Sequence, residues 1–130
     1  MEKLKAGYVA FGTMFYEPAN LKKISERAEK QLEEAGIDLV KTGPVFGEDK
    51  EPERAIAELQ KEDWDFLIAN VINWVDMRGV MRVLRDFKAK PMVLYSFGGF
   101  TEGDTLISPA AGAGTTAIRY PLEQWGFRFK

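Results

Sequence analysis

Segments typical of strands and of helices alternate along the whole chain, and this alternation constrains the fold more than any other feature. Apolar residues recur at helical spacing in four segments, which begin at Pro18, at Glu51, near Met77 and near Ala111. The strand-like segments around them are short, apolar and mostly bounded by glycine or proline: 6–12, 37–41, 65–72, 91–97 and 127–129. Strands that alternate with helices predict a parallel sheet covered on both faces.

We therefore expect an α/β fold, a three-layer, flavodoxin-like, doubly wound parallel sheet of five strands in the order 2-1-3-4-5. The segments 65–72 and 91–97 are nearly continuous apolar runs, as expected of central strands. No helix follows the fifth strand, so we expect residues 1–130 to form a single domain that lacks the fifth helix and is either a piece of a larger protein or covered there by a partner. Part of the sheet should then be bare. We expect exposed apolar side chains there and association into a homo-oligomer. The sequence does not fix which residues of a strand face which side, so the candidates include Leu67, Ala69, Val93 and Tyr95.

Composition narrows the classes of partner. Apolar residues make up 45% of the chain and charged residues 29%, which is typical of globular proteins. The net charge of -2 gives no reason to expect nucleic acid or an anionic membrane as a partner. No apolar run approaches the ~20 residues that span a bilayer, and the N-terminus lacks the layout of a signal peptide. A cytoplasmic protein is the expectation.

The chain contains neither cysteine nor histidine. Disulfides and thiol chemistry are therefore excluded, and so are most zinc and other transition-metal sites built by these residues alone. Histidine is also the commonest general base in enzymes. This composition argues against a self-contained enzyme, and we expect no catalytic residue, no metal ligand and no bound cofactor in this chain.

The candidate binding site lies where the strands end. In an open parallel sheet, ligands bind beyond the carboxyl ends of the strands, at the point where the winding reverses. Here this point lies between the first and third strands, with the fourth strand nearby. The candidate substrate-binding residues are therefore Thr13, Tyr16, Asn73, Trp74 and Ser96.

Trp74 admits two interpretations. A tryptophan that follows an apolar strand can cap the hydrophobic core, or it can face a ligand beyond the sheet. The neighbouring Asn73 and the loop after the first strand, which contains glycine and tyrosine, make the ligand interpretation about as strong as the cap.

Other chemistries known at such switch points fit poorly. The loop "GTMFYEPA" after the first strand has bulky apolar residues where a flavin-phosphate loop needs Ser, Thr and Gly. Asn73 stands where a receiver domain needs an aspartate. The stretch "GAGTTA" (112–117) matches the dinucleotide fingerprint in its letters, but no strand directly precedes it. We interpret it as a helix start whose small residues pack closely on the sheet.

Three long stretches together resemble the N-terminal domain of the L-fucose isomerase-like proteins, relatives of the fucose and arabinose isomerases. They are "YVAFGTMFYEPANLKKISERAEKQLEEAGIDLV" (8–40), "WDFLIANVINWVDMRGVMRVLRDFKAKPMVLYS" (64–96) and "FTEGDTLISPAAGAGTTAIRYPLEQWGFRFK" (100–130). The resemblance spans nearly the whole chain as an overall pattern. It implies that residues 1–130 are a flavodoxin-like domain and a fragment of a larger sugar isomerase, an enzyme that interconverts aldoses and ketoses.

The resemblance also implies which domain of the enzyme binds the metal and which contacts the sugar. In this family a divalent metal, typically manganese, is bound by later domains, so the metal is expected in the parent enzyme. The N-terminal domain helps to close the active site of a neighbouring subunit, and an aromatic residue after its third strand touches the sugar. Trp74 matches that aromatic residue, whereas the arginine that fucose isomerase uses after the first strand has no match in "FGTMFYEP".

Three functional hypotheses follow. The first is a substrate-recognition and oligomer-assembly domain of a metal-dependent aldose–ketose isomerase, which is not catalytic alone. The second is a stand-alone, non-enzymatic, flavodoxin-like module that binds a small polar ligand at the same place. The third is a structural fragment without a ligand.

Overall fold

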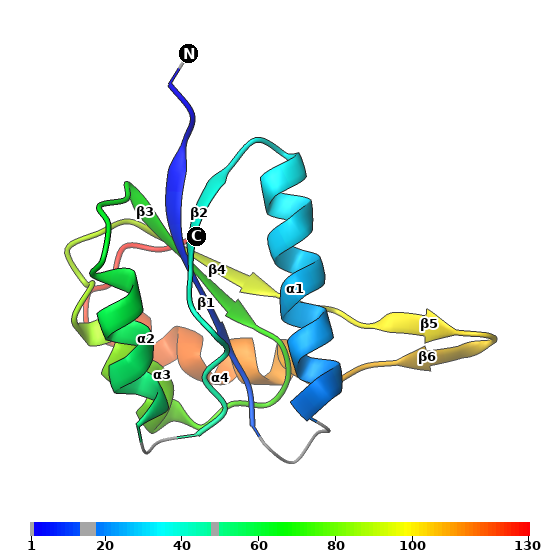
Figure 1. Ribbon diagram of the computed structural model, residues 1–130. Coiled ribbons are helices and arrows are strands. Elements are labelled where there is room, and N and C mark those ends of the chain that lie inside the picture. Colours follow the sequence, from blue (N-terminus) through cyan, green and yellow to red (C-terminus); the bar gives the residue numbers. More distant parts are fainter. Residues whose placement is uncertain (1, 14–17, 48–49) are drawn as a thin grey trace.

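A computed structural model describes residues 2–13, 18–47 and 50–130 (Figure 1). Strands and helices alternate as expected, except for one hairpin late in the chain. In chain order the elements are β1 (Lys5–Phe11), α1 (Pro18–Glu34), β2 (Asp38–Lys41), α2 (Glu51–Leu59), β3 (Phe66–Val71), α3 (Met77–Arg85), β4 (Met92–Ser96), β5 (Phe100–Glu102), β6 (Thr105–Ile107) and α4 (Ala111–Gln124).

The main sheet has four parallel strands in the order β2-β1-β3-β4, which confirms the α/β class and the parallel sheet. β1 and β3 lie in the middle, and the side chains of both strands are almost all buried. This burial on both faces explains why their sequences are nearly continuous apolar runs.

The expected fifth strand is represented only by a bridge. Residues 128–130 run parallel to the start of β4, where Met92 donates its amide N–H to the Arg128 carbonyl at 3.0 Å and Leu94 donates to the Lys130 carbonyl at 2.7 Å. α4 extends to Gln124, and the chain then turns at Gly126, whose φ is 73°. This turn leaves only a short segment beside β4. The sheet is therefore a four-stranded one, and the five-stranded order is not confirmed.

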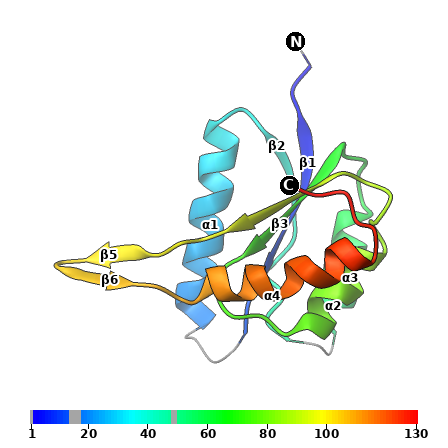
Figure 2. The same ribbon diagram turned by 180° about the vertical axis from the view of Figure 1, so that it is seen from behind.

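The segment after β4, expected to be a loop, contains an antiparallel hairpin. β5 pairs with β6 around a turn in which Gly103 has a φ of 60°. The hairpin projects away from the sheet past α1 (Figures 1 and 2). Its strands are three residues long and mostly exposed, so they lack the apolar alternation by which strands are recognised in a sequence.

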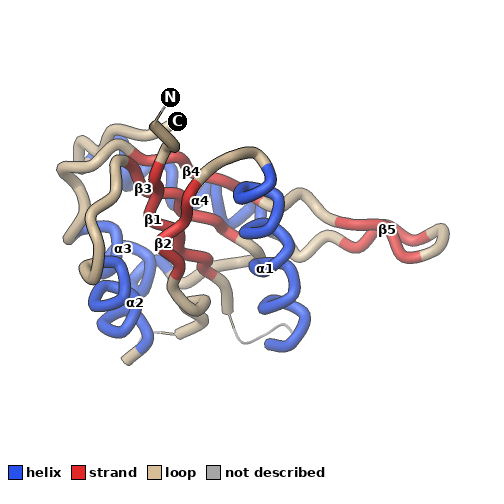
Figure 3. The backbone as a smooth tube through the Cα atoms, turned by 45° about the horizontal axis from the view of Figure 1, so that its top comes forward, coloured by secondary structure: helices blue, strands red, loops and turns tan. Residues whose placement is uncertain are grey.

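Helices cover the two faces of the sheet unequally. α2, α3 and α4 lie on one face and α1 alone lies on the other, as the expected winding predicts (Figure 3). Leu67 and Ala69 are fully buried under the three helices, so their expected exposure is wrong: their register positions turn them toward the larger core. Val93 has the opposite parity, and 38% of its surface is exposed on the α1 face.

Among the described helices, none combines the length and apolar character needed to cross a membrane.

Candidate functional site

A reciprocal pair of hydrogen bonds joins the ends of β1 and β3. Thr13 donates its backbone N–H to Asn73 Oδ1 at 2.9 Å, and Asn73 Nδ2 donates to the Thr13 carbonyl at 3.3 Å. Both residues are buried. A Cβ at Gly12 would lie 2.5 Å from Asn73 Oδ1, so glycine is required for this close approach. The structure therefore brings together two of the predicted site residues, one from each strand.

Trp74 lies directly beyond this pair of hydrogen bonds, which we call the Thr13–Asn73 clamp, and is 51% exposed. Its neighbours Asn73 and Val75 are both buried, which fixes the backbone on either side of it. Asp76 then caps α3, because its Oδ1 accepts the backbone N–H of Arg78 at 2.8 Å. An exposed indole on an anchored backbone can stack on a ligand at little cost in ordering.

The other two candidates are less informative. Ser96 is partly buried at the end of β4, where it pairs in register with Val71 of β3. Tyr16 lies in the segment 14–17, outside the described residues. The site that can be described therefore consists of the Thr13–Asn73 clamp, the exposed Trp74 and the neighbouring end of β4.

The described candidate residues offer groups for hydrogen bonding and stacking. Asn73 already uses one acceptor position and one amide hydrogen on Thr13, while the hydroxyl of Thr13 is buried and has no hydrogen-bond partner in the described part of the chain. None of Thr13, Asn73, Trp74 and Ser96 has a side chain that ionises near neutral pH. The exposed ring of Trp74 is the group best placed to meet a ligand.

The "GAGTTA" stretch lies inside α4, in agreement with its interpretation as a helix start. Gly114 packs against the end of β3, and a Cβ there would lie 2.9 Å from the Asn73 carbonyl oxygen. The hydroxyls of Thr115 and Thr116 bond back to the carbonyls of Ala111 and Gly112, both at 2.9 Å. These small residues bring α4 close to the end of β3, so the helix packs directly against the backbone of Asn73.

Sequence reasoning missed a polar chain buried between the sheet and α1. Asn70 Nδ2 donates to the Tyr8 hydroxyl at 2.8 Å; that hydroxyl lies 3.3 Å from Ser25 Oγ, and Ser25 Oγ bonds Glu29 Oε1 at 3.3 Å. Burial raises the pKa of Tyr8 to about 12. Burial also raises the pKa of Glu29, although the charge of Lys41 opposes this shift. The one signal in the sequence is Asn70, a polar residue inside an apolar strand.

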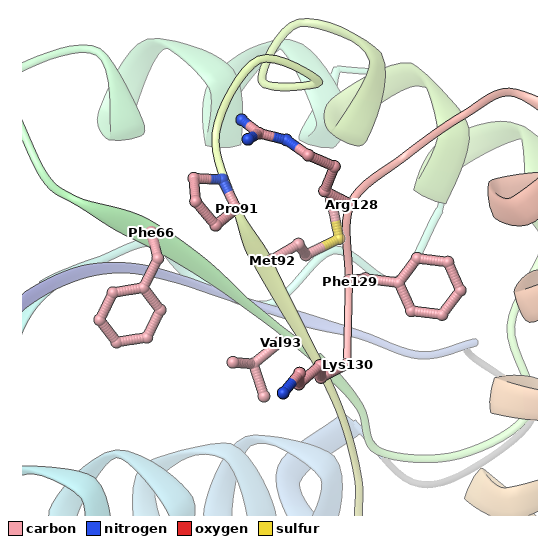
Figure 4. Close-up of a pocket in the computed structure, with 7 residues that line it drawn as sticks. All are labelled: Phe66, Pro91, Met92, Val93, Arg128, Phe129 and Lys130. Atoms are coloured by element: carbon pink, nitrogen blue, oxygen red, sulfur yellow. The ribbon is translucent and has the colours of Figure 1, made fainter.

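An open groove lies on the α1 face, over the amino-terminal half of β4. Its volume is about 420 Å³. Figure 4 shows Phe66, Val93 and Lys130 beside one another around this groove. The complete lining consists of Phe66, Pro91, Met92, Val93, Arg128, Phe129 and Lys130. This groove is the bare part of the sheet that the unequal number of helices predicts, and its rim is positively charged.

The described residues contain no group of three or more acidic side chains arranged to hold a metal ion. The manganese implied by the resemblance therefore finds no ligand set in the part of this chain that the structure describes. Comparisons with protein-family models and with curated proteins find no match to the chain.

Proposed function

We propose that this chain is the substrate-recognition and assembly domain of an aldose–ketose isomerase and that it is not catalytic alone. The observation that carries the proposal is the position of Trp74. The ring is half exposed beyond the carboxyl end of a central strand, where open parallel sheets bind ligands. Trp74 matches the aromatic residue that touches the sugar in the resembled family, and its ring here is accessible to a ligand.

The physical chemistry of sugars supports this role. The C–H face of a pyranose or furanose ring is apolar and packs on an indole face, and the excluded water strengthens the polar contacts around it. The backbone around Trp74 is anchored by the Thr13–Asn73 hydrogen bonds and by the α3 cap, so binding a ligand need not order this part of the backbone. The proposal leaves the metal and the catalytic acids and bases to residues outside this chain, which has no histidine or cysteine.

The assembly part of the proposal rests on the groove over β4. Val93 is exposed there beside Phe66, and Arg128 and Lys130 add positive charge. The hairpin turn of the same chain has the opposite charge, from the exposed Glu102 and Asp104. A second copy of the chain therefore offers both an apolar face and complementary charge, so the partner we propose is a second copy in a two-fold dimer.

Fluorescence quenching tests the sugar-binding role. The chain has three tryptophans, and Trp64 is buried, so in a Trp125→Phe variant acrylamide quenches mainly Trp74. Titration with L-fucose or D-arabinose should reduce this quenching in a saturable way, and glycerol should not. The matched Trp74→Phe variant, which keeps Trp125, should show no such protection. Equal protection in both variants, or none in either, would contradict the proposed role of Trp74.

An activity assay tests the second half of the proposal. The chain with manganese should not interconvert aldoses and ketoses above background, and turnover would overturn the claim that it is not catalytic alone. The exposed ring also favours the stand-alone binding module as second candidate. That module would bind another small polar ligand while leaving the quenching of Trp74 unchanged by every aldose tested.

A further inference from the structure

A second cavity lies between α1 and the projecting hairpin, on the α1 face beyond the end of β4. Its volume is about 330 Å³, at the lower end of the range for small-molecule sites. The hairpin follows β4 and projects past α1 (Figure 1), and the residues that line the cavity come from the first half of α1 and from the chain between the end of β4 and the end of the hairpin. The lining residues are Asn20, Lys23, Ile24, Arg27, Phe97, Phe100, Glu102 and Ile107. Trp74 does not contribute, so this site is separate from the proposed sugar site.

The floor of this cavity is apolar and partly aromatic. Ile24 is buried in the core under α1, and Phe97 and Phe100 pack against the same core. The rings of Phe97 and Phe100 are tilted, with their centroids 6.3 Å apart. Two aromatic side chains and a branched aliphatic one form a surface that suits a flat or branched apolar group.

Two cations line the α1 wall. Lys23 and Arg27 lie one helical turn apart, so both extend over the same side of the cavity. Neither forms an ion pair within the described ranges, whereas Lys22 and Lys30 on the same helix are paired with acidic residues four positions later. Glu102 is the only acidic lining residue, so the lining has a net positive charge.

A further feature of the cavity is its hairpin wall. The opposite wall is a two-stranded hairpin, a structure that is only marginally stable alone in water. At its root, Gly99 has a φ of 142°, and a Cβ there would lie 2.7 Å from the Ile107 carbonyl oxygen. A molecule held between α1 and the hairpin would stabilise this wall.

We propose that the cavity binds a small amphipathic anion, with an aromatic or branched apolar body and a carboxylate or phosphate head group. The body lies on Phe97, Phe100 and Ile24, and the head group accepts hydrogen bonds from Lys23 and Arg27. Binding orders the hairpin, because the ligand contacts both walls. The proposal rests on this cavity alone and is independent of the sugar-binding role of Trp74.

Nuclear magnetic resonance of the whole chain tests the site, with phenyl phosphate as the probe. Backbone amide signals of residues 20–27 and 97–107 should shift in a saturable way. Benzyl alcohol tests the need for the anion, and inorganic phosphate tests the need for the apolar body; both should bind at least about tenfold more weakly. Replacing Lys23 and Arg27 together by Ala should also weaken phenyl phosphate at least about tenfold.

A matched double variant controls for charge. Replacing Lys22 and Lys30 by Ala removes two positive charges from the same helix but leaves the cavity lining intact, and it should keep the wild-type affinity. All four residues are exposed, and unchanged melting temperatures would show that both variants fold. The proposal is overturned if the named signals do not move, if benzyl alcohol or inorganic phosphate binds as well as phenyl phosphate, or if the two double variants lose affinity equally.

Discussion

The two faces of the sheet differ in how completely they are closed. On the three-helix face, side chains from α2, α3 and α4 interlock with those of the strands, and the core includes Trp64, whose ring lies 5.3 Å from that of Phe87. On the α1 face, one helix covers most of the sheet, a polar chain runs through the interface, and the amino-terminal half of β4 is left open. We therefore expect substitutions on the three-helix face to cost more stability than substitutions at the open part of the α1 face.

Among the substitutions that should still allow folding, the largest effect is expected on the three-helix face, called the closed face below. Trp64 is 4% exposed, and its Nε1 donates to the Leu59 carbonyl at 2.9 Å. Trp64→Ala should lower the free energy of unfolding by about 3–5 kcal/mol, because it leaves a large cavity and an unpaired carbonyl. Urea denaturation measures this loss. Trp125→Ala, at a residue 52% exposed, is the control and should cost far less; equal losses would mean that the closed face is not the main source of stability.

The second effect concerns the polar chain under α1. The folded-state pKa of Tyr8 is raised to about 12 from an ordinary value of about 10. Above pH 10 the unfolded chain ionises this hydroxyl first, so its contribution to stability is intact below pH 10 and lost as the pH rises toward 12. The loss should reach about 2–3 kcal/mol. Chemical denaturation of the wild type and of Tyr8→Phe across pH 9–12 isolates this loss, because the variant lacks the hydroxyl. If the free energies of unfolding of the two proteins fall in parallel with pH, the burial of this hydroxyl is contradicted.

Trp74 should contribute little to folding. Because half of its surface is already exposed, Trp74→Ala should lower the free energy of unfolding by about 1 kcal/mol, well below the effect at Trp64. Chemical denaturation of the variant measures this. A loss in the range of 3–5 kcal/mol would instead identify Trp74 as a core residue and remove the main support for its role toward a sugar.

The smallest effect on stability is expected on the open face. Val93→Lys places a charge at a position 38% exposed beside the groove, and the free energy of unfolding should change by no more than about 0.5 kcal/mol. Leu67→Lys, one strand away but facing the closed core, is the informative contrast and should prevent stable folding. Similar tolerance of both variants would show that the two faces do not differ as described.

Much of the fold could be predicted from local patterns. Apolar runs and helical spacing gave the parallel sheet and its four helices, because burial on both sides leaves a direct mark on the sequence of a central strand. The hairpin escaped prediction because its exposed three-residue strands bear no such mark. The side of the sheet toward which Leu67 and Ala69 point could not be predicted, because it depends on the pairing register, which only the folded sheet fixes.

The candidate site was predictable in place but not in detail. The rule for ligand sites in open sheets pointed to the ends of β1 and β3, where Thr13 and Asn73 do meet. That the amide of Asn73 clamps the Thr13 backbone, while the adjacent Trp74 is exposed, depends on side-chain directions beyond the end of a strand. The sequence does not encode these directions in any periodic pattern.

Sedimentation velocity of the chain over micromolar concentrations tests most directly whether the open face serves association. The wild type should sediment as a monomer at the lowest concentrations and increasingly as a dimer as the concentration rises. Val93→Lys should remain monomeric throughout, since it removes the exposed apolar side chain of the groove, and burying a lysine there would cost the hydration of its charge. A wild type that remains monomeric at the highest concentration, or a Val93→Lys variant that dimerises equally well, would contradict the account.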